Sequence, residues 1–146
     1  MTHQLNVKGS NMNVVDSSGW LEYFAVDGPN AEFFAAAIED PEQLVVPAIS
    51  LYEVFKRVCQ QKDESEALQA VATMMQSQVI DLTATLALDA AKASLDLKLP
   101  LAGSIILATA QTHQAILWTQ DGHFEDIDGV RFHRQAAKPR AAIESS

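Results

Sequence analysis

Short apolar segments alternate with helical patterns along most of this chain. The apolar segments are rich in β-branched residues and almost wholly apolar, which is typical of strands buried on both faces. They predict five strands, at residues 13–15, 44–46, 79–80, 116–118 and 130–132.

Between these segments, apolar residues recur at the three- and four-residue spacing of helices. One predicted helix opens at Pro29 and ends before Pro41, and the next carries an apolar stripe of Leu51, Val54, Phe55, Val58 and Cys59. Further helices are predicted over 64–75, 83–97 and 101–112. The last of them is apolar on nearly all sides, so we expect it to be buried.

This alternation predicts an α/β fold, a three-layer α/β/α domain around a central, mostly parallel sheet of four to five strands. A chain of 146 residues that is 48% hydrophobic is long enough for one such domain. We predict the domain over residues 12–137. Residues 1–11 are predicted to be an N-terminal tail, either an expression remnant or an extension before a second start at Met12, and residues 138–146 a flexible C-terminal tail.

The lengths of the apolar runs and the number of cysteines indicate in which part of the cell the protein is expected. No apolar run approaches the roughly 18–20 residues of a membrane span, and the N-terminus has no apolar signal core. The single cysteine, Cys59, cannot form an intrachain disulfide and is predicted to be a small core residue rather than a catalytic thiol. These features favour a cytoplasmic protein with no membrane partner.

The net charge of −9 argues against simple binding of nucleic acid by neutralised phosphates, which usually needs a basic stripe. The Lys and Arg residues are instead scattered along the sequence. Chemistry on nucleic acid would therefore require a metal ion between carboxylates and phosphate, or a basic partner.

Three acidic residues are predicted to meet at one edge of the sheet. Asp16 follows the first strand directly, Asp121 follows the fourth, and Glu53 lies early in the helix after the second. Ligands of open parallel sheets bind beyond the carboxyl ends of the strands. Because clustered carboxylates repel one another unless a cation neutralises them, a hard divalent metal is the natural inference.

Each acid also has a simpler interpretation. Asp16 is a good N-cap for a following helix, and Glu53 is positioned for a solvated ion pair with Lys56 or Arg57. Asp121-Gly122 is a common turn dipeptide. Only the placement of all three acids at strand ends favours a functional site.

Four segments carry a resemblance to a known family. They are Val14-Val15-Asp16-Ser17-Ser18, Ser50-Leu51-Tyr52-Glu53-Val54, the helical segment at 101–110, and Trp118-Thr119-Gln120-Asp121-Gly122-His123-Phe124. In this order and spacing, which spans roughly residues 12–135, the chain resembles the PIN-domain ribonucleases. It is most similar to the VapC-type toxins of bacterial toxin–antitoxin pairs.

The resemblance implies a function for these residues. The acids of the family bind Mg²⁺ or Mn²⁺ and cut RNA by metal-assisted hydrolysis. Carried over by motif, Asp16 corresponds to the first metal ligand, Glu53 to the second acid and Asp121 to the acid after the fourth strand. Thr119 and Ser17 correspond to supporting residues. The resemblance also implies a cognate VapB-type antitoxin as partner, and a homodimer.

Gly103 departs from the family pattern, because an aspartate that binds the metal is expected at this position. One explanation is that the helix starts later, with Ser104 as its N-cap. The other is a substitution, natural or deliberate, that removes a principal metal ligand. In that case we expect the chain to bind metal weakly and to cleave RNA slowly or not at all.

Two other classes stay open at this point. The chain is alternatively an inactive binding module that keeps an antitoxin-binding surface, with its early aromatic residues forming either an apolar groove or the core: Trp20, Tyr23, Phe24, Phe33 and Phe34. A phosphoacceptor domain would use Asp81, but no lysine directly follows the fifth strand. The histidines at 113, 123 and 133 lack a zinc-ligand spacing and are predicted to be surface or packing residues.

Overall fold

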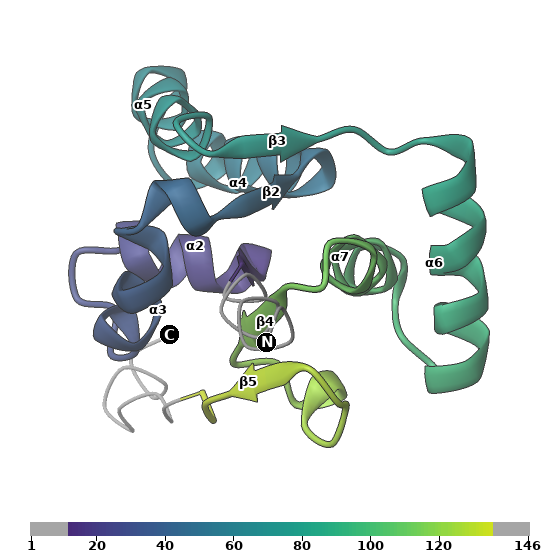
Figure 1. Ribbon diagram of the computed structural model, residues 1–146. Helices are drawn as coiled ribbons and strands as arrows, with labels where there is room; N and C mark the ends of the chain where they lie inside the picture. Colours follow the sequence, from purple (N-terminus) through teal and green to yellow (C-terminus); the bar gives the residue numbers. More distant parts are fainter. Residues whose placement is uncertain (1–11, 136–146) are drawn as a thin grey trace.

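The structure is a computed structural model that describes residues 12–135. Both predicted tails, and residues 136–137 of the predicted domain, lie outside the described residues. The elements follow one another along the chain as β1 (Asn13–Val15), α2 (Ser17–Phe24), α3 (Ala31–Ile38), η1 (Pro41–Gln43), β2 (Val45–Pro47), α4 (Ala48–Gln61), α5 (Glu64–Met74), β3 (Gln78–Ile80), α6 (Ala84–Leu97), α7 (Leu101–Thr112), β4 (Ile116–Thr119), η2 (Gly122–Phe124) and β5 (Val130–Phe132) (Figure 1).

All the strand pairs are parallel. Strands β1, β4 and β5 pair in the order β1-β4-β5, and β2 pairs with β3. A single parallel bridge between Asn13 and Leu44 joins the two groups, which gives the order β3-β2-β1-β4-β5. The predicted α/β fold with a parallel sheet is therefore confirmed.

Helices cover both faces of this sheet. Successive strand residues alternate between two cores, because side chains of a strand point to opposite faces. Val15 packs with Trp20 and Phe34 of α2 and α3, whereas Val14 packs with Ile106 of α7 and with Phe124. Helix α6 lies outside α7, and the two helices share a small apolar cluster of their own (Figure 1). The result is the predicted three-layer arrangement.

The early aromatic residues belong largely to the core. Trp20 and Phe34 are fully buried, and Tyr23, Phe24 and Phe33 pack against the same cluster while partly exposed. Cys59 is half-buried against this cluster as well, with a free thiol. These aromatic side chains therefore serve mainly to pack α2 and α3 against the sheet.

Helix length in the described part of the chain bears on membrane insertion. None of its helices is by itself long and apolar enough to span a bilayer, and α6 and α7 satisfy the length and composition criteria only as a pair bent by 114°.

Gly19 of α2 offers a test of this packing. A Cβ atom at Gly19 would lie 2.5 Å from Cε1 of Phe34 and 2.8 Å from Cγ1 of Val15, and both of these side chains are fully buried. We expect Gly19→Ala to lower the free energy of unfolding by about 1–3 kcal/mol through overpacking. In an open helix the same change would raise it by about 1 kcal/mol.

Urea denaturation measures the difference. Gly122→Ala is the matched control, because nothing lies within 4 Å of the corresponding Cβ position. A Gly19→Ala protein at least as stable as the parent would show that α2 does not approach β1 and α3 this closely.

Candidate functional site

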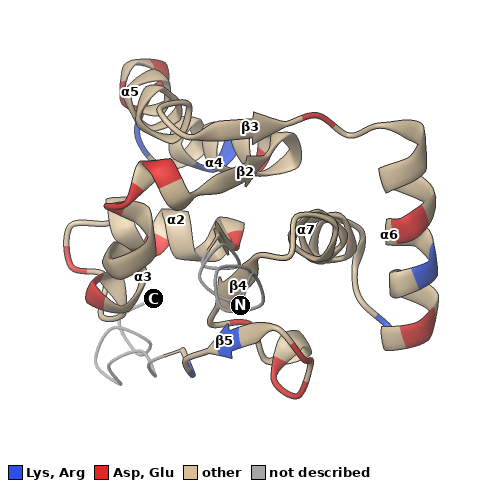
Figure 2. Cartoon of the chain, in the orientation of Figure 1, with Lys and Arg blue, Asp and Glu red and all other residues tan. Residues whose placement is uncertain are grey.

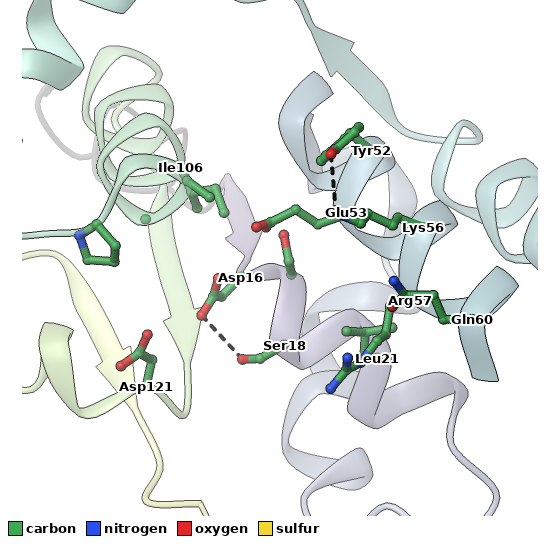
Figure 3. A pocket seen from close by; sticks show the side chains of 14 residues that line it. Asp16, Ser18, Leu21, Tyr52, Glu53, Lys56, Arg57, Gln60, Ile106 and Asp121 are labelled. Carbon is green, nitrogen blue, oxygen red and sulfur yellow. Dashed lines mark hydrogen bonds between the residues drawn. The ribbon is translucent and has the colours of Figure 1, made fainter.

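A pocket of about 590 Å³ opens at the carboxyl ends of β1 and β4. It lies between α2, α4 and the start of α7 (Figure 3). Five of the residues singled out from the sequence line it: Asp16, Ser17, Glu53, Gly103 and Asp121. The structure therefore brings together side chains that are more than 100 positions apart in the sequence.

Asp16 forms the buried end of this pocket, with 7% of its surface exposed. Its Oδ2 accepts hydrogen bonds from Thr119 Oγ1 at 2.9 Å and from Ser18 Oγ at 3.2 Å. The pKa of this carboxyl is raised from 3.8 to about 6, mainly by burial and to a smaller extent by the nearby Asp121, while the hydrogen bonds from the two hydroxyl groups oppose the shift. Asp16 stands at the N-cap position of α2, as predicted, but its side chain makes no capping hydrogen bond, so capping does not account for the carboxylate.

Thr119 connects two of the acids. Its buried hydroxyl donates to Asp16 and accepts a hydrogen bond from the backbone N–H of Asp121 at 3.0 Å. Ser17 contributes in a different way, because its hydroxyl donates to Ser50 Oγ of α4 at 3.2 Å. The two predicted supporting residues thus hold neighbouring elements together around the pocket.

Asp121 has two roles in the local structure. It lines the pocket, and its Oδ1 accepts from the backbone N–H of His123 at 2.9 Å and so caps η2. The Nδ1 atom of His123 lies 2.7 Å from the same oxygen. The predicted turn at Asp121-Gly122 is therefore present, and Asp121 also lines the pocket. The contact with His123 was not anticipated from the sequence.

Glu53 extends from α4 toward the centre of the pocket (Figure 3). It is half-buried, and within the described residues it makes no hydrogen bond and no ion pair. The predicted alternative, an ion pair with Lys56 or Arg57, is therefore not formed. Both of these basic side chains nevertheless line the same pocket, as does Tyr52.

Gly103 is the third residue of α7 and is buried in the pocket wall. The helix begins at Leu101, and the Ser104 hydroxyl donates to the carbonyl oxygen of Leu101 at 2.7 Å. The explanation that α7 starts later, with Ser104 as its N-cap, is therefore wrong. A Cβ atom at Gly103 would lie 3.0 Å from Cζ of the fully buried Phe124, so this ring would have to shift by a few tenths of an ångström.

The acids only partly meet the requirements of a metal ion. Carboxylate oxygens are the ligands that Mg²⁺ prefers. Within residues 12–135, however, no three Asp, Glu, His or Cys side chains are grouped closely enough to hold an ion. The residues present therefore do not form a complete metal site.

Comparisons with known proteins define the family. The PIN domain model matches residues 14–130. A toxin–antitoxin complex from Klebsiella pneumoniae is similar in structure, with a TM-score of 0.67 and 26% identity, over 82% of this chain and 95% of the other. VapC20 of Mycobacterium tuberculosis, described as a sarcin-ricin loop cleaving toxin, shares 16% identity over 80% of this chain and 95% of its own, with a TM-score of 0.67.

VapBC from Salmonella typhimurium bound to DNA is similar at 14% identity and a TM-score of 0.67, over 86% of this chain and 98% of the other. No curated protein matches the sequence significantly. The chain belongs to the PIN-domain family, and its resemblance to the VapC-type toxins is confirmed. This family assignment gives no support to the phosphoacceptor alternative.

The raised pKa of Asp16 predicts how the free energy of unfolding depends on pH. Since this pKa rises from 3.8 to about 6 on folding, the folded protein binds this proton more tightly than the unfolded chain. Stability should therefore fall as pH rises from about 4 through about 6, and this carboxyl should account for about 3 kcal/mol of the fall.

Asp16→Asn cannot ionise, so its free energy of unfolding relative to the parent should grow across that pH range and level off above it. Urea titrations in EDTA at a series of pH values measure this difference. Asp96→Asn, at an exposed position of α6, is the matched control for the loss of one charge. A difference between Asp16→Asn and the parent that stays constant with pH would contradict the burial of this charge.

Proposed function

We propose that the chain is the toxin of a toxin–antitoxin pair and a defective metal-dependent endoribonuclease. Its pocket binds Mg²⁺ or Mn²⁺ weakly and hydrolyses RNA slowly or not at all. One observation carries this proposal: Asp16, Glu53 and Asp121 line one pocket at the edge of the parallel sheet, with Gly103 in its wall. The wall thus lacks a carboxylate at the position where the family resemblance leads us to expect one.

The surroundings of Asp16 support a chemical role for the pocket. A buried carboxylate beside a second acid is costly to maintain, and such perturbed groups gather at functional sites. Thr119 holds Asp16 and the backbone of Asp121 in fixed positions. Glu53 makes no interaction of its own within the described residues and is free to contact a ligand.

A VapB-type antitoxin is the proposed partner, because toxin–antitoxin complexes are among the similar structures. A groove of about 270 Å³ lies between α2, α4 and α5; half of its lining residues are apolar, Phe24, Val58 and Ala70 among them, and half are polar or charged. Such a mixed groove suits an amphipathic helical segment. A cytoplasmic location and a homodimer, expected from the sequence and the resemblance, stay predictions.

The second candidate function is an inactive binding module on the same scaffold. The absence of a three-residue ligand group within residues 12–135 favours it. In that case the groove between α2, α4 and α5 is the functional surface, and antitoxin binding alone is retained.

Restoring the missing acid distinguishes the two candidates. In Gly103→Asp the new carboxylate stands in the first turn of α7, where the helix dipole favours a negative charge. Losing even an outer partner of a metal ligand costs about 10–100-fold, so we expect Gly103→Asp to cleave RNA at least about tenfold faster in Mg²⁺. EDTA should abolish this activity.

Gly103→Asn is the matched control, because it makes the same contact with Phe124 without adding a charge. Binding of Mn²⁺, followed by calorimetry, should tighten in Gly103→Asp only. Equal cleavage by Gly103→Asp and the parent would refute the idea that Gly103 impairs the enzyme. No cleavage by any of these proteins would favour the binding module.

A further inference from the structure

The pocket that holds the three acids also carries basic side chains from α4. Figure 2 shows acidic residues on most elements of the structure and a short basic segment on α4. Among the described residues, the cationic side chains that line this pocket are Lys56 and Arg57. They stand one helical turn beyond Glu53 on α4.

Neither cation is paired with an acid in the described part of the chain. The ion pairs there are those of His123 with Asp121 and of Arg134 with Glu125. Lys56 lies over the ring of Tyr52, 5.6 Å from its centre, and Arg57 is exposed and makes no hydrogen bond within the described residues. An unpaired guanidinium next to three acids is available for an anionic group that enters from outside.

Arg57 also borders a second, smaller pocket. This pocket of about 240 Å³ adjoins the first, and the two share Ser18, Leu21 and Arg57 in their linings. The second pocket adds amide and carboxylate groups from four different parts of the chain: Glu22, Gln61, Gln120 and Gln135. Arg57 therefore lies where the acidic pocket passes into a polar one.

A hydrogen-bond network holds two of the polar groups of the second pocket, those of Glu22 and Gln120, in place. The buried Gln120 accepts from Asn30 Nδ2 at 2.8 Å, and Glu22 Oε2 accepts from the backbone N–H of Asn30 at 2.6 Å. The other oxygen of Glu22 has only a long contact of 3.5 Å with Gln120 Nε2. Glu22 Oε1 is therefore a fixed acceptor with most of its hydrogen-bonding capacity unused.

We propose that these two pockets hold neighbouring nucleotides of a single-stranded RNA. Arg57, assisted by Lys56, binds the phosphate next to the one in the acidic pocket, and the second pocket receives a base. Guanidinium groups suit phosphate because their donors match two of its oxygens. Glu22 accepts a hydrogen bond from an exocyclic amino group, which cytosine has and uracil lacks. This inference deepens the proposed function and depends on it for the identity of the ligand.

The test measures RNA binding without metal and without cleavage. Fluorescence anisotropy of a short labelled single-stranded RNA is followed in EDTA at low salt. We expect Arg57→Ala to weaken binding about tenfold and to reduce the slope of log K against log salt by about 0.7, the contribution of one phosphate contact on a single strand. Arg57→Lys should keep the slope.

Lys92→Ala on α6 is the matched control, because this exposed cation lies outside both pockets. It should leave affinity and slope unchanged. No RNA binding by the parent in EDTA, no effect of Arg57→Ala, or an equal effect of Lys92→Ala would overturn the phosphate contact. Arg57→Ala impairing only antitoxin binding would assign the cation to the partner instead.

The base pocket is tested with homopolymers of the two pyrimidines. We expect the parent to prefer oligo(C) over oligo(U) by at least about fivefold, and Glu22→Gln to remove this preference. Equal binding of the two oligomers by the parent would overturn this assignment.

Cleavage and binding together separate this inference from the proposed function. If Gly103→Asp does not cleave RNA while Arg57→Ala still weakens RNA binding, the proposed function fails and the phosphate contact of Arg57 stands. If Gly103→Asp cleaves RNA and the double variant with Arg57→Ala has the same KM, the phosphate contact alone fails.

Discussion

The parallel pairing of β1 with β4 is the constraint on which the site depends. It aligns Val15 with Trp118, and the backbone N–H of Asp16 continues the ladder to the carbonyl oxygen of Trp118 at 3.0 Å. The residues that follow both strands therefore emerge at one edge. There the fully buried Thr119 uses one hydroxyl for two bonds, as donor to Asp16 and as acceptor from Asp121. These bonds offset part of the cost of burying a carboxylate beside a second acid.

Much of the fold could be predicted from the sequence, because buried strands and amphipathic helices have distinct apolar patterns. Val14 and Val15 are an example: two successive apolar residues predict a strand that is buried on both faces, and the structure places their side chains in opposite cores. The helices predicted at 64–75, 83–97 and 101–112 agree with α5, α6 and α7 to within one residue at each end. The start of α4 was harder to predict, because this helix begins directly after Pro47, before its apolar stripe becomes regular. Ser104 resembles a cap in sequence, but its hydroxyl turns back to the preceding turn of its own helix.

The candidate site was predictable only where it follows from topology. Acids at the ends of parallel strands share an edge, and the structure places all three in one pocket. The basic side chains of α4 carry no such signal, since exposed Lys and Arg are ordinarily solvated. The contact of Asn30 with Gln120 joins residues 90 positions apart and has no pattern in the sequence.

The close approach of Phe124 to Gly103 ties the wall of the pocket to the hydrophobic core behind it. A side chain at position 103 would place its Cβ atom 3.0 Å from Cζ of this fully buried ring, so the ring would have to move by a few tenths of an ångström. Any substitution at position 103 therefore acts on core packing as well as on the pocket, and a smaller residue at position 124 would lower its cost.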